Sequence, residues 1–168
     1  MKRVLVLGGT GMLGHKLVQV FGRRFDTFTT IRRPFEYVRG FQIFDEDRTL
    51  SGVDVTDLDR LRMTIERVEP DVVVNAVGVI KQLDIAGDLN YLSQVNILLP
   101  NELSILANDL GFRLIGISTD CVFSGSRGNY SEEDEPDPVD PYGRTKVLSE
   151  STDGNCLTIR TSIIGREL

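Results

Sequence analysis

The amino-acid sequence predicts an α/β domain in which a doubly wound parallel sheet of about six strands carries helices on both faces. Two observations lead to this fold class. Short runs rich in valine, isoleucine and leucine alternate along the chain with longer segments of helical period, which is typical of βαβ units with right-handed crossovers. In addition, a glycine-rich turn follows the first apolar run at residues 8–14, and this placement indicates a Rossmann-type sheet.

The composition is typical of one globular domain. The chain has 168 residues, of which 40% are hydrophobic and 26% charged, and this length suits a single domain with its own core. The formal net charge of -6 disfavours nucleic acid and anionic membranes as partners. Because no segment approaches the roughly 20 apolar residues of a membrane span, we expect a cytoplasmic protein. Cys121, Cys156 and His15 lack the spacing of metal ligands, so no metal site is expected.

The first third of the chain predicts three strands and one helix. Strands are expected at Arg3–Leu7 and Asp26–Ile31, the second being less apolar because it carries threonines. A helix is expected at 12–22, where leucine, valine and phenylalanine recur at helical spacing. Residues 32–51 are interpreted as a long loop holding at most a short helix, since proline, glycine and scattered aromatic residues break any period. A short third strand is expected at 52–55.

The middle of the chain predicts two helices around a fourth strand. Apolar residues share one face of the segment 57–68, and the valine-rich run 72–76 is interpreted as a strand. The segment 90–110 again has apolar residues at helical spacing, and Gly111 is placed to end that helix in the left-handed conformation. Pro100 lies inside the same segment, so we expect the helix to kink or break there.

The last third predicts two strands, a loop and a helix. The apolar runs at 112–118 and Cys156–Arg160 are interpreted as the fifth and sixth strands. Between them, 119–140 is polar, acidic and rich in proline, which is typical of a loop. The helix expected at 141–151 has a proline near its first turn, where proline is well tolerated.

The glycine-rich turn predicts a dinucleotide site. Residues 8–14 read GGTGMLG and satisfy both G-x-G-x-x-G and G-x-x-G-x-x-G. Glycines there permit a tight turn and a close approach to a pyrophosphate, whose charge the start of the helix favours. The residues expected to contact it are Gly8, Thr10, Gly11, Met12, Leu13 and Gly14.

Residues after the next strands are expected to contact the rest of the dinucleotide. Arg32 and Arg33 follow the second strand, where an acid usually binds the adenine ribose of NAD. Because guanidinium groups bind phosphate in a bidentate manner, they favour NADP(H) as the cofactor, with NAD(H) as the alternative. Residues after the third and fourth strands should line the adenine and the path to the nicotinamide ribose: Asp54, Val55, Asn75, Ala76 and Val77.

Tyr142 and Lys146 lie four residues apart and therefore share one face of the expected helix. A free tyrosine titrates near ~10, and a cation beside it would bring that pKa closer to the working pH of a general acid. A tyrosine and a lysine at this spacing are common by chance. However, Ser118, Thr119 and Asp120 end the fifth strand and should reach the same edge of the sheet. Together these side chains predict an acid–base site.

These motifs resemble those of the extended short-chain dehydrogenase/reductases over essentially the whole chain. STDCVFSG at 118–125, the acidic loop after it and YGRTK at 142–146 are most similar to the dTDP-4-dehydrorhamnose reductase group, which typically has S-T-D-Y-V-F-x-G and Y-G-K-T-K. The glycine loop and the Asn-Ala pair at 75–76 match as well, and Asn96 falls where the family has a structural or relay asparagine. Cys121 and Arg144 replace the family's usual tyrosine and lysine without removing a catalytic group.

The resemblance implies NAD(P)H-dependent reduction of a nucleotide-linked 4-keto sugar. Tyr142 would protonate the alkoxide that forms at C4, and Lys146 would bind the nicotinamide ribose and lower the pKa of Tyr142. Thr119 would hydrogen-bond the carbonyl oxygen, with Ser118 or Asp120 assisting. Thus the implied catalytic residues are Thr119, Tyr142 and Lys146, and the implied substrate contacts are Ser118, Thr119, Asp120 and Tyr142.

Two other functions stay open. The first is a nucleotide-sugar epimerase; a dehydratase is disfavoured because Cys121, rather than a second acid, follows Asp120. The second is a subunit that holds NADP without turnover, as in the methionine adenosyltransferase regulatory subunit, although an intact Thr119, Tyr142 and Lys146 favours an enzyme. The family also has a C-terminal substrate-binding lobe that is not apparent in this sequence. Residues 1–168 are therefore interpreted as the NAD(P)-binding domain of a truncated chain that binds NADP(H) better than it catalyses a reaction and that is open to being inactive, and a homodimer is a compatible assembly.

Overall fold

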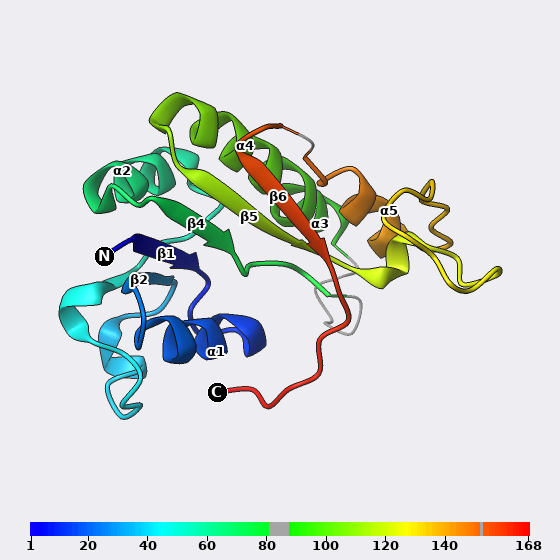
Figure 1. Cartoon of the computed structure of the whole chain (residues 1–168). Helices are drawn as coiled ribbons and strands as arrows, with labels where there is room; N and C mark the ends of the chain where they lie inside the picture. Colours follow the sequence, from blue (N-terminus) through cyan, green and yellow to red (C-terminus); the bar gives the residue numbers. More distant parts are fainter. Residues whose placement is uncertain (81–87, 152) are drawn as a thin grey trace.

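The computed structural model describes residues 1–80, 88–151 and 153–168, and it confirms the predicted α/β fold class (Figure 1). Six strands of the described chain form one sheet in the order β3-β2-β1-β4-β5-β6, and every neighbouring pair is parallel. The strands are β1 (Arg3–Leu7), β2 (Asp26–Ile31), β3 (Thr49–Ser51), β4 (Val72–Asn75), β5 (Arg113–Ser118) and β6 (Cys156–Arg160). The order reverses between β1 and β4, so the carboxyl ends of these two strands flank the crevice where such sheets bind ligands.

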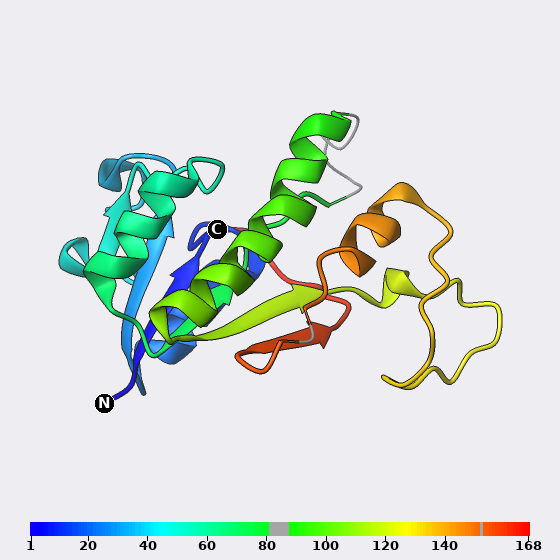
Figure 2. The same cartoon turned by 90° about the horizontal axis from the view of Figure 1, so that it is seen from above.

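Helices cover both faces of the sheet, as Figures 1 and 2 show. The helices are α1 (Met12–Phe21), α2 (Leu58–Val68), α3 (Leu89–Ser93), α4 (Leu99–Leu110) and α5 (Pro141–Val147). Val4 and Val6 of β1 belong to the core under α1, whereas Leu5 and Leu7 belong to the core under α2 and α4. Successive side chains of a strand point to opposite faces, so this central strand is buried on both sides and reads as a continuous apolar run.

The third strand lies elsewhere than the sequence predicts. β3 covers Thr49–Ser51 rather than 52–55, so that earlier placement is wrong. Gly52 has a φ of 69° and turns the chain just after the strand. Val53 and Val55, whose alternation suggested a strand, are buried after this turn instead. The loop expected before them contains two short 3₁₀ helices, η1 (Phe35–Tyr37) and η2 (Glu46–Arg48), in addition to β3.

The helix expected at 90–110 consists of three consecutive pieces: α3, a π-helical turn η4 (Gln94–Leu98) and α4. Proline has no N–H, and its ring crowds the carbonyl group four residues earlier. The widened turn directly precedes Pro100, and the N–H of Leu99 bonds to the carbonyl five residues back. The predicted interruption at Pro100 is therefore a π-bulge within one continuous helical segment. Gly111 ends α4 with a φ of 76°, as expected.

α5 is shorter than predicted but begins where expected. Asp140 caps it by accepting a hydrogen bond from the Gly143 N–H at 2.7 Å. A Cβ added at Gly143 would overlap the carbonyl oxygen of Cys121, in the short helix η5 (Asp120–Val122). Glycine therefore lets the first turn of α5 pack directly against η5, which follows β5. Within the part of the chain that the structure describes, no helix is both long and apolar enough to cross a bilayer.

Candidate active site at the carboxyl edge of the sheet

The glycine-rich turn joins β1 to α1 at the carboxyl edge of the sheet. Gly8 has a φ of 80°, and a Cβ added at Gly14 would overlap the carbonyl oxygen of Gly8, so both positions require glycine. Gly11 is the N-cap residue of α1 and has no side chain with which to cap it. The N–H groups of a first helical turn have no intrahelical partners, which suits an anion. Half-buried side chains in this turn are Thr10, Met12 and Leu13.

The end of β4 lies beside the glycine-rich turn, as predicted. A Cβ added at Gly8 would come within 2.6 Å of Cγ2 of Val77. Asn75 is buried, and its Oδ1 accepts a hydrogen bond from the Val77 N–H at 3.1 Å. The N–H of Ala76 donates to the carbonyl of Leu7 at 3.2 Å. The structure thus brings residues 75–77 together with the expected pyrophosphate site.

Arg32 and Arg33 directly follow β2, and both side chains are exposed. The guanidinium carbon of Arg33 lies 4.7 Å from the centre of the Tyr37 ring, a distance that permits a cation–π contact. Nη1 of Arg32 donates to the hydroxyl of Tyr91, a residue of α3, at 3.5 Å. The cationic side chains of Arg32 and Arg33 therefore lie where the sequence predicts the contact with the adenine ribose of the cofactor.

Asp54 and Val55 lie after β3 rather than at its end. Oδ1 of Asp54 accepts hydrogen bonds from the N–H and the hydroxyl of Thr56, at 3.0 and 2.8 Å. The backbone hydrogen bond is the main cause of the lowered pKa of Asp54; burial opposes it, and the Thr56 hydroxyl and the charge of Arg32 add to it. Val55 is buried in the core under α2. A carboxylate thus lies near Arg32 at the adenine end of the predicted site.

Thr119 and Tyr142 meet at the end of β5. Oγ1 of Thr119 donates to Oδ1 of Asp120 at 3.1 Å and accepts the Cys121 N–H at 3.2 Å. Burial raises the pKa of Tyr142, and its hydrogen bond with Thr119 offsets only part of this effect, to which the nearby Cys121, Asp120 and Asp140 add. The net shift of the Tyr142 pKa is therefore opposite in direction to the one predicted from sequence, and the phenol is protonated at neutral pH. The effect of Lys146 on this pKa stays a prediction.

The carboxylate of Asp120 also contacts the segment that follows β6. Its Oδ2 accepts a hydrogen bond from Oγ of Ser162 at 2.5 Å. This bond is the main cause of the lowered pKa of Asp120, with burial opposing and Thr119 assisting. The segment then runs along the carboxyl edge toward α1, where Gly165 lies beside Met12 (Figure 1). It therefore lies between the predicted catalytic groups and the glycine-rich turn.

Lys146 lies one helical turn beyond Tyr142 and is only 7% exposed. Its Nζ donates a hydrogen bond to the carbonyl of Ile117 at 2.7 Å. Burial lowers the pKa of Lys146, while the charge of Glu150 opposes that effect. An ammonium group has three donors, and this bond directs one of them to the backbone of β5.

Asn96 joins the end of β4 to α5 from within the π-helical turn. It is 1% exposed. Its Oδ1 accepts the Val79 N–H at 2.9 Å, and its Nδ2 donates to the Val79 carbonyl at 2.8 Å. Nδ2 also lies 3.5 Å from Oγ1 of Thr145, which stands between the predicted catalytic residues of α5. The structural role predicted for this asparagine is visible in these contacts, while its relay role stays a prediction.

Glu150 and Arg160 belong to the site, although sequence reasoning missed them. Oγ of Ser118 donates to Oε1 of Glu150 at 2.6 Å, and Arg160 donates to both carboxylate oxygens at 2.8 to 3.3 Å. Lys146 and Glu150 lie four residues apart within the helix predicted at 141–151, and this spacing was the signal that could have found the acid, although α5 ends before Glu150. The hydroxyl proton of Ser118 is directed to Glu150, and its predicted contact with substrate stays untested.

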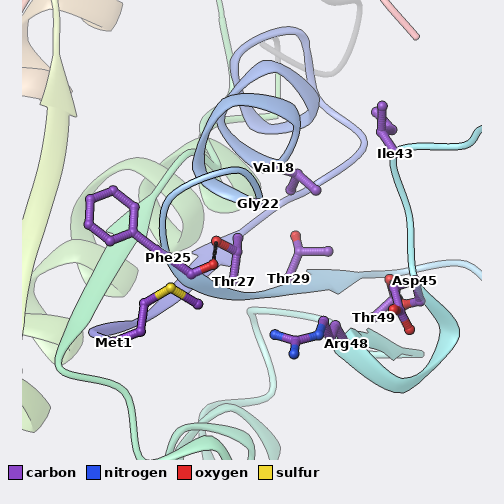
Figure 3. Close-up of a pocket in the computed structure, with 10 residues that line it drawn as sticks. All are labelled: Met1, Val18, Gly22, Phe25, Thr27, Thr29, Ile43, Asp45, Arg48 and Thr49. Carbon is purple, nitrogen blue, oxygen red and sulfur yellow. Dashed lines mark hydrogen bonds between the residues drawn. The ribbon is translucent and has the colours of Figure 1, made fainter.

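The cavity in Figure 3 lies away from this edge, between α1, β2 and the start of β3. Its volume is about 330 Å³. Its described lining contains none of the predicted site residues and consists of Met1, Val18, Gly22, Phe25, Thr27, Thr29, Ile43, Asp45, Arg48 and Thr49. Among the described residues, no group of three or more histidine, cysteine, aspartate or glutamate side chains could hold a metal ion.

Comparison with known proteins relates this arrangement to a family. Residues 1–165 match the family model described as RmlD substrate binding domain. The chain belongs to this family, that of the dTDP-4-dehydrorhamnose reductases. The probable low-salt glycan biosynthesis reductase Agl14 of Haloferax volcanii is 30% identical over 149 residues, which cover 86% of this chain and 46% of that protein. Methionine adenosyltransferase 2 subunit beta of Mus musculus is also 30% identical over 149 residues, covering 89% and 42%. The chain thus spans somewhat less than half the length of these relatives.

Solved structures of the RmlD family and of other short-chain dehydrogenase/reductases share the fold. A hypothetical dTDP-4-dehydrorhamnose reductase from Sulfolobus tokodaii superposes with a TM-score of 0.78 at 26% identity, covering 95% of this chain and 55% of that one. The dTDP-4-dehydrorhamnose reductase of Bacillus anthracis, in complex with NADP, has a TM-score of 0.72 at 21% identity, covering 95% and 53%. WbmG of Bordetella bronchiseptica, in complex with NAD and UDP, has a TM-score of 0.72 at 19% identity, covering 88% and 47%. At the last two identities the likeness concerns the fold alone.

Proposed function

We propose that this chain is the cofactor-binding and catalytic part of an NADPH-dependent reductase of nucleotide-linked 4-keto sugars. The observation that carries the proposal is the meeting of Thr119 and Tyr142 at the carboxyl edge, with the buried ammonium of Lys146 one turn behind. The glycine-rich turn lies at the same edge, as a hydride-transfer site requires. Membership of the RmlD family supports the same reaction class.

The glycine-rich turn fits a dinucleotide because its tight backbone, which only glycine permits at two positions, leads directly into the first turn of α1. Added Cβ atoms at Gly8 and Gly14 would collide with Val77 and with the turn's own backbone. The N–H groups at the start of α1, which have no intrahelical partners, are the donors that a pyrophosphate would use. We infer that residues 8–14, with 54–55 and 75–77, would hold the cofactor. A bound nicotinamide cofactor supplies the hydride of the reaction.

The protein side chains would donate a proton to the substrate oxygen and stabilise the negative charge that develops on it. Tyr142 is protonated at neutral pH and therefore carries the proton that a general acid donates. Burial raises its pKa above the range that suits such an acid, and we infer that the Lys146 ammonium would bring that pKa back toward neutral pH during catalysis. Thr119 would hydrogen-bond the substrate oxygen after its hydroxyl turns away from Asp120. Lys146 keeps two donors beyond the one bonded to Ile117, and we infer that they face the ribose of the cofactor and Tyr142.

NADP(H) is the proposed cofactor, because Arg32 and Arg33 are exposed cations at the end of β2. Fluorescence titration of the chain with NADPH and with NADH tests this preference. We expect tighter binding of NADPH, and tighter binding of NADH would overturn it.

Replacement of Tyr142 tests the reaction. Tyr142→Phe in the full-length protein is expected to lower NADPH-dependent reduction of a dTDP-4-keto-6-deoxy sugar by at least about a hundredfold, since a general acid contributes that much, while NADPH still binds. Tyr130→Phe, a matched change in the loop after β5, should retain activity. Full turnover by the Tyr142 variant would remove this residue from the mechanism.

The alternative is a subunit that binds NADP without turnover, and the similarity to methionine adenosyltransferase 2 subunit beta favours it. A nucleotide-sugar epimerase is the other alternative. Cofactor consumption and product formation measured together separate the three functions. A reductase oxidises NADPH in step with product, an epimerase forms product without net consumption of its cofactor, and a binding subunit does neither. A cytoplasmic location and a homodimer stay predictions.

A further inference from the structure

Glu150 is an acid in the active-site region that the proposed mechanism leaves without a role. It follows α5 and lies four residues after Lys146. Its side chain is only 12% exposed. It accepts a hydrogen bond from Ser118 at 2.6 Å and forms a bidentate pair with Arg160, at 2.8 Å for the shortest contact. A carboxylate held this firmly by charged and neutral donors is an anion of fixed position.

These contacts converge on the end of β5. Ile117 provides the carbonyl that binds Nζ of Lys146, Ser118 donates to Glu150, and Thr119 follows directly. Arg160 is the register partner of Ser118 on β6. The carboxylate of Glu150 therefore ties the ends of two strands to the helix that carries the acid and the lysine.

The contacts of Arg160 continue into the loop after β5 through two aromatic rings. The guanidinium carbon of Arg160 lies 5.2 Å from the centre of the Phe123 ring. Phe123 stacks on Tyr130 with ring centres 4.4 Å apart. The Arg160 guanidinium thus contacts both the Glu150 carboxylate and the Phe123 ring, and the second contact limits its freedom to leave the carboxylate.

The charges around Lys146 give Glu150 an electrostatic role as well. Burial lowers the pKa of Lys146, and Glu150 is the group that opposes it. For Glu150 itself, burial raises the pKa, but its bonds with Arg160 and Ser118 and the charges of Arg160 and Lys146 lower it more. The other charged groups at this edge, Asp120 and Asp140, act on Tyr142.

We propose that Glu150 is a positioning residue for the Lys146–Tyr142 pair: it ties the ends of β5 and β6 to the end of α5, and it places a partly buried carboxylate four residues after Lys146. The catalytic consequence rests on the proposed reductase function, but the effect on Lys146 does not. Without this carboxylate, Lys146 would lose its proton more readily and would support the developing charge on Tyr142 less well.

The test is an NMR titration of the ligand-free chain labelled with ¹³C at lysine Cε, in which Lys146→Met identifies the signal. Glu150→Gln keeps acceptor oxygen for its neighbours but removes the charge, so the midpoint of Lys146 should move to lower pH. Arg160→Gln removes the opposing cation and should move the midpoint to higher pH. Glu135→Gln, an exposed acid of the loop after β5, is the matched control and should leave it unchanged.

A purely structural role predicts a different pattern, because both variants would then loosen the same contacts. An unchanged midpoint in folded Glu150→Gln, or a downward movement in Arg160→Gln, would overturn the proposal. If Glu150→Gln does not fold, the direction in which Arg160→Gln moves the titration midpoint of Lys146 still tests the proposal. Because this measurement uses no substrate or cofactor, it stands even if the proposed reductase activity is refuted.

The kinetic consequence is measured separately in the full-length protein. For Glu150→Gln we expect kcat to fall by about tenfold through misplacement of the catalytic pair, with KM for the sugar substrate little changed. Glu150→Asp keeps the charge and should recover part of kcat. Equal kcat in the wild type and Glu150→Gln would remove the catalytic part of the proposal.

Discussion

Asn96→Ala is expected to destabilise the chain strongly, because the Asn96 side-chain amide hydrogen-bonds to backbone groups that are buried from solvent. Oδ1 and Nδ2 of Asn96 bond to the N–H and carbonyl of Val79 at 2.9 and 2.8 Å. Asn96 is 1% exposed and Val79 is 3% exposed. Removing the amide takes from the two buried Val79 backbone groups the partner that each has among the described residues.

The magnitude follows from these two groups. A buried polar group that loses its partner costs about 1–3 kcal/mol, so we expect a loss of about 3 kcal/mol in the free energy of unfolding. This is a large share of the roughly 5–15 kcal/mol that stabilises a domain. For a chain of this length, the expected fall in Tm is about 6–12 °C.

Urea unfolding followed by circular dichroism measures this loss. Asn101→Ala is the matched control: Asn101 lies on the continuing helix α4 and donates to the carbonyl of Ile97 at 2.9 Å, but it is exposed. Water can replace that bond, so the control should stay within about 0.5 kcal/mol of the wild type. The reasoning is refuted if Asn96→Ala loses less than about 1 kcal/mol, or if both variants lose the same amount.

Three further predictions concern the glycine turn, the buried acid and the cofactor. Gly14→Ala should abolish measurable NADPH binding in a fluorescence titration because its Cβ would overlap the Gly8 carbonyl, whereas Gly40→Ala, with open space around it, should bind normally. The pKa of Glu150 is lowered from its ordinary value of 4.5, so the unfolded chain binds more protons than the folded one as the pH falls below that value. Acidification should therefore destabilise the wild type more than Glu150→Gln in thermal melts at pH 3–6, and parallel curves would contradict this. Replacing Arg32 and Arg33 together by serine should weaken NADPH binding by at least about tenfold while NADH binding changes little, and an equal loss for both would show that these cations do not select the phosphate.

Much of the fold was predictable because strong local signals agreed with the tertiary structure. β1 and the glycine-rich turn follow from an apolar run and from conformations that only glycine adopts. β3 was misplaced because three residues carry too little pattern, and the valines that suggested a strand are buried after Gly52 instead. The π-helical turn before Pro100 has a visible cause, but sequence alone does not say whether the helix breaks or widens.

The candidate site, like the fold, has features that the sequence predicted and features that only the structure reveals. The sequence by itself predicted which groups would carry the proposed chemistry, since the spacing of Tyr142 and Lys146 and the motifs shared with a known family identify Thr119, Tyr142 and Lys146. Only the tertiary structure decided in which direction the pKa values of Tyr142 and Lys146 shift, because a pKa depends on burial and on partners distant along the chain. Burial raises the pKa of Tyr142 and lowers that of Lys146, and Glu150 acquires its role only where β5 and β6 meet the end of α5.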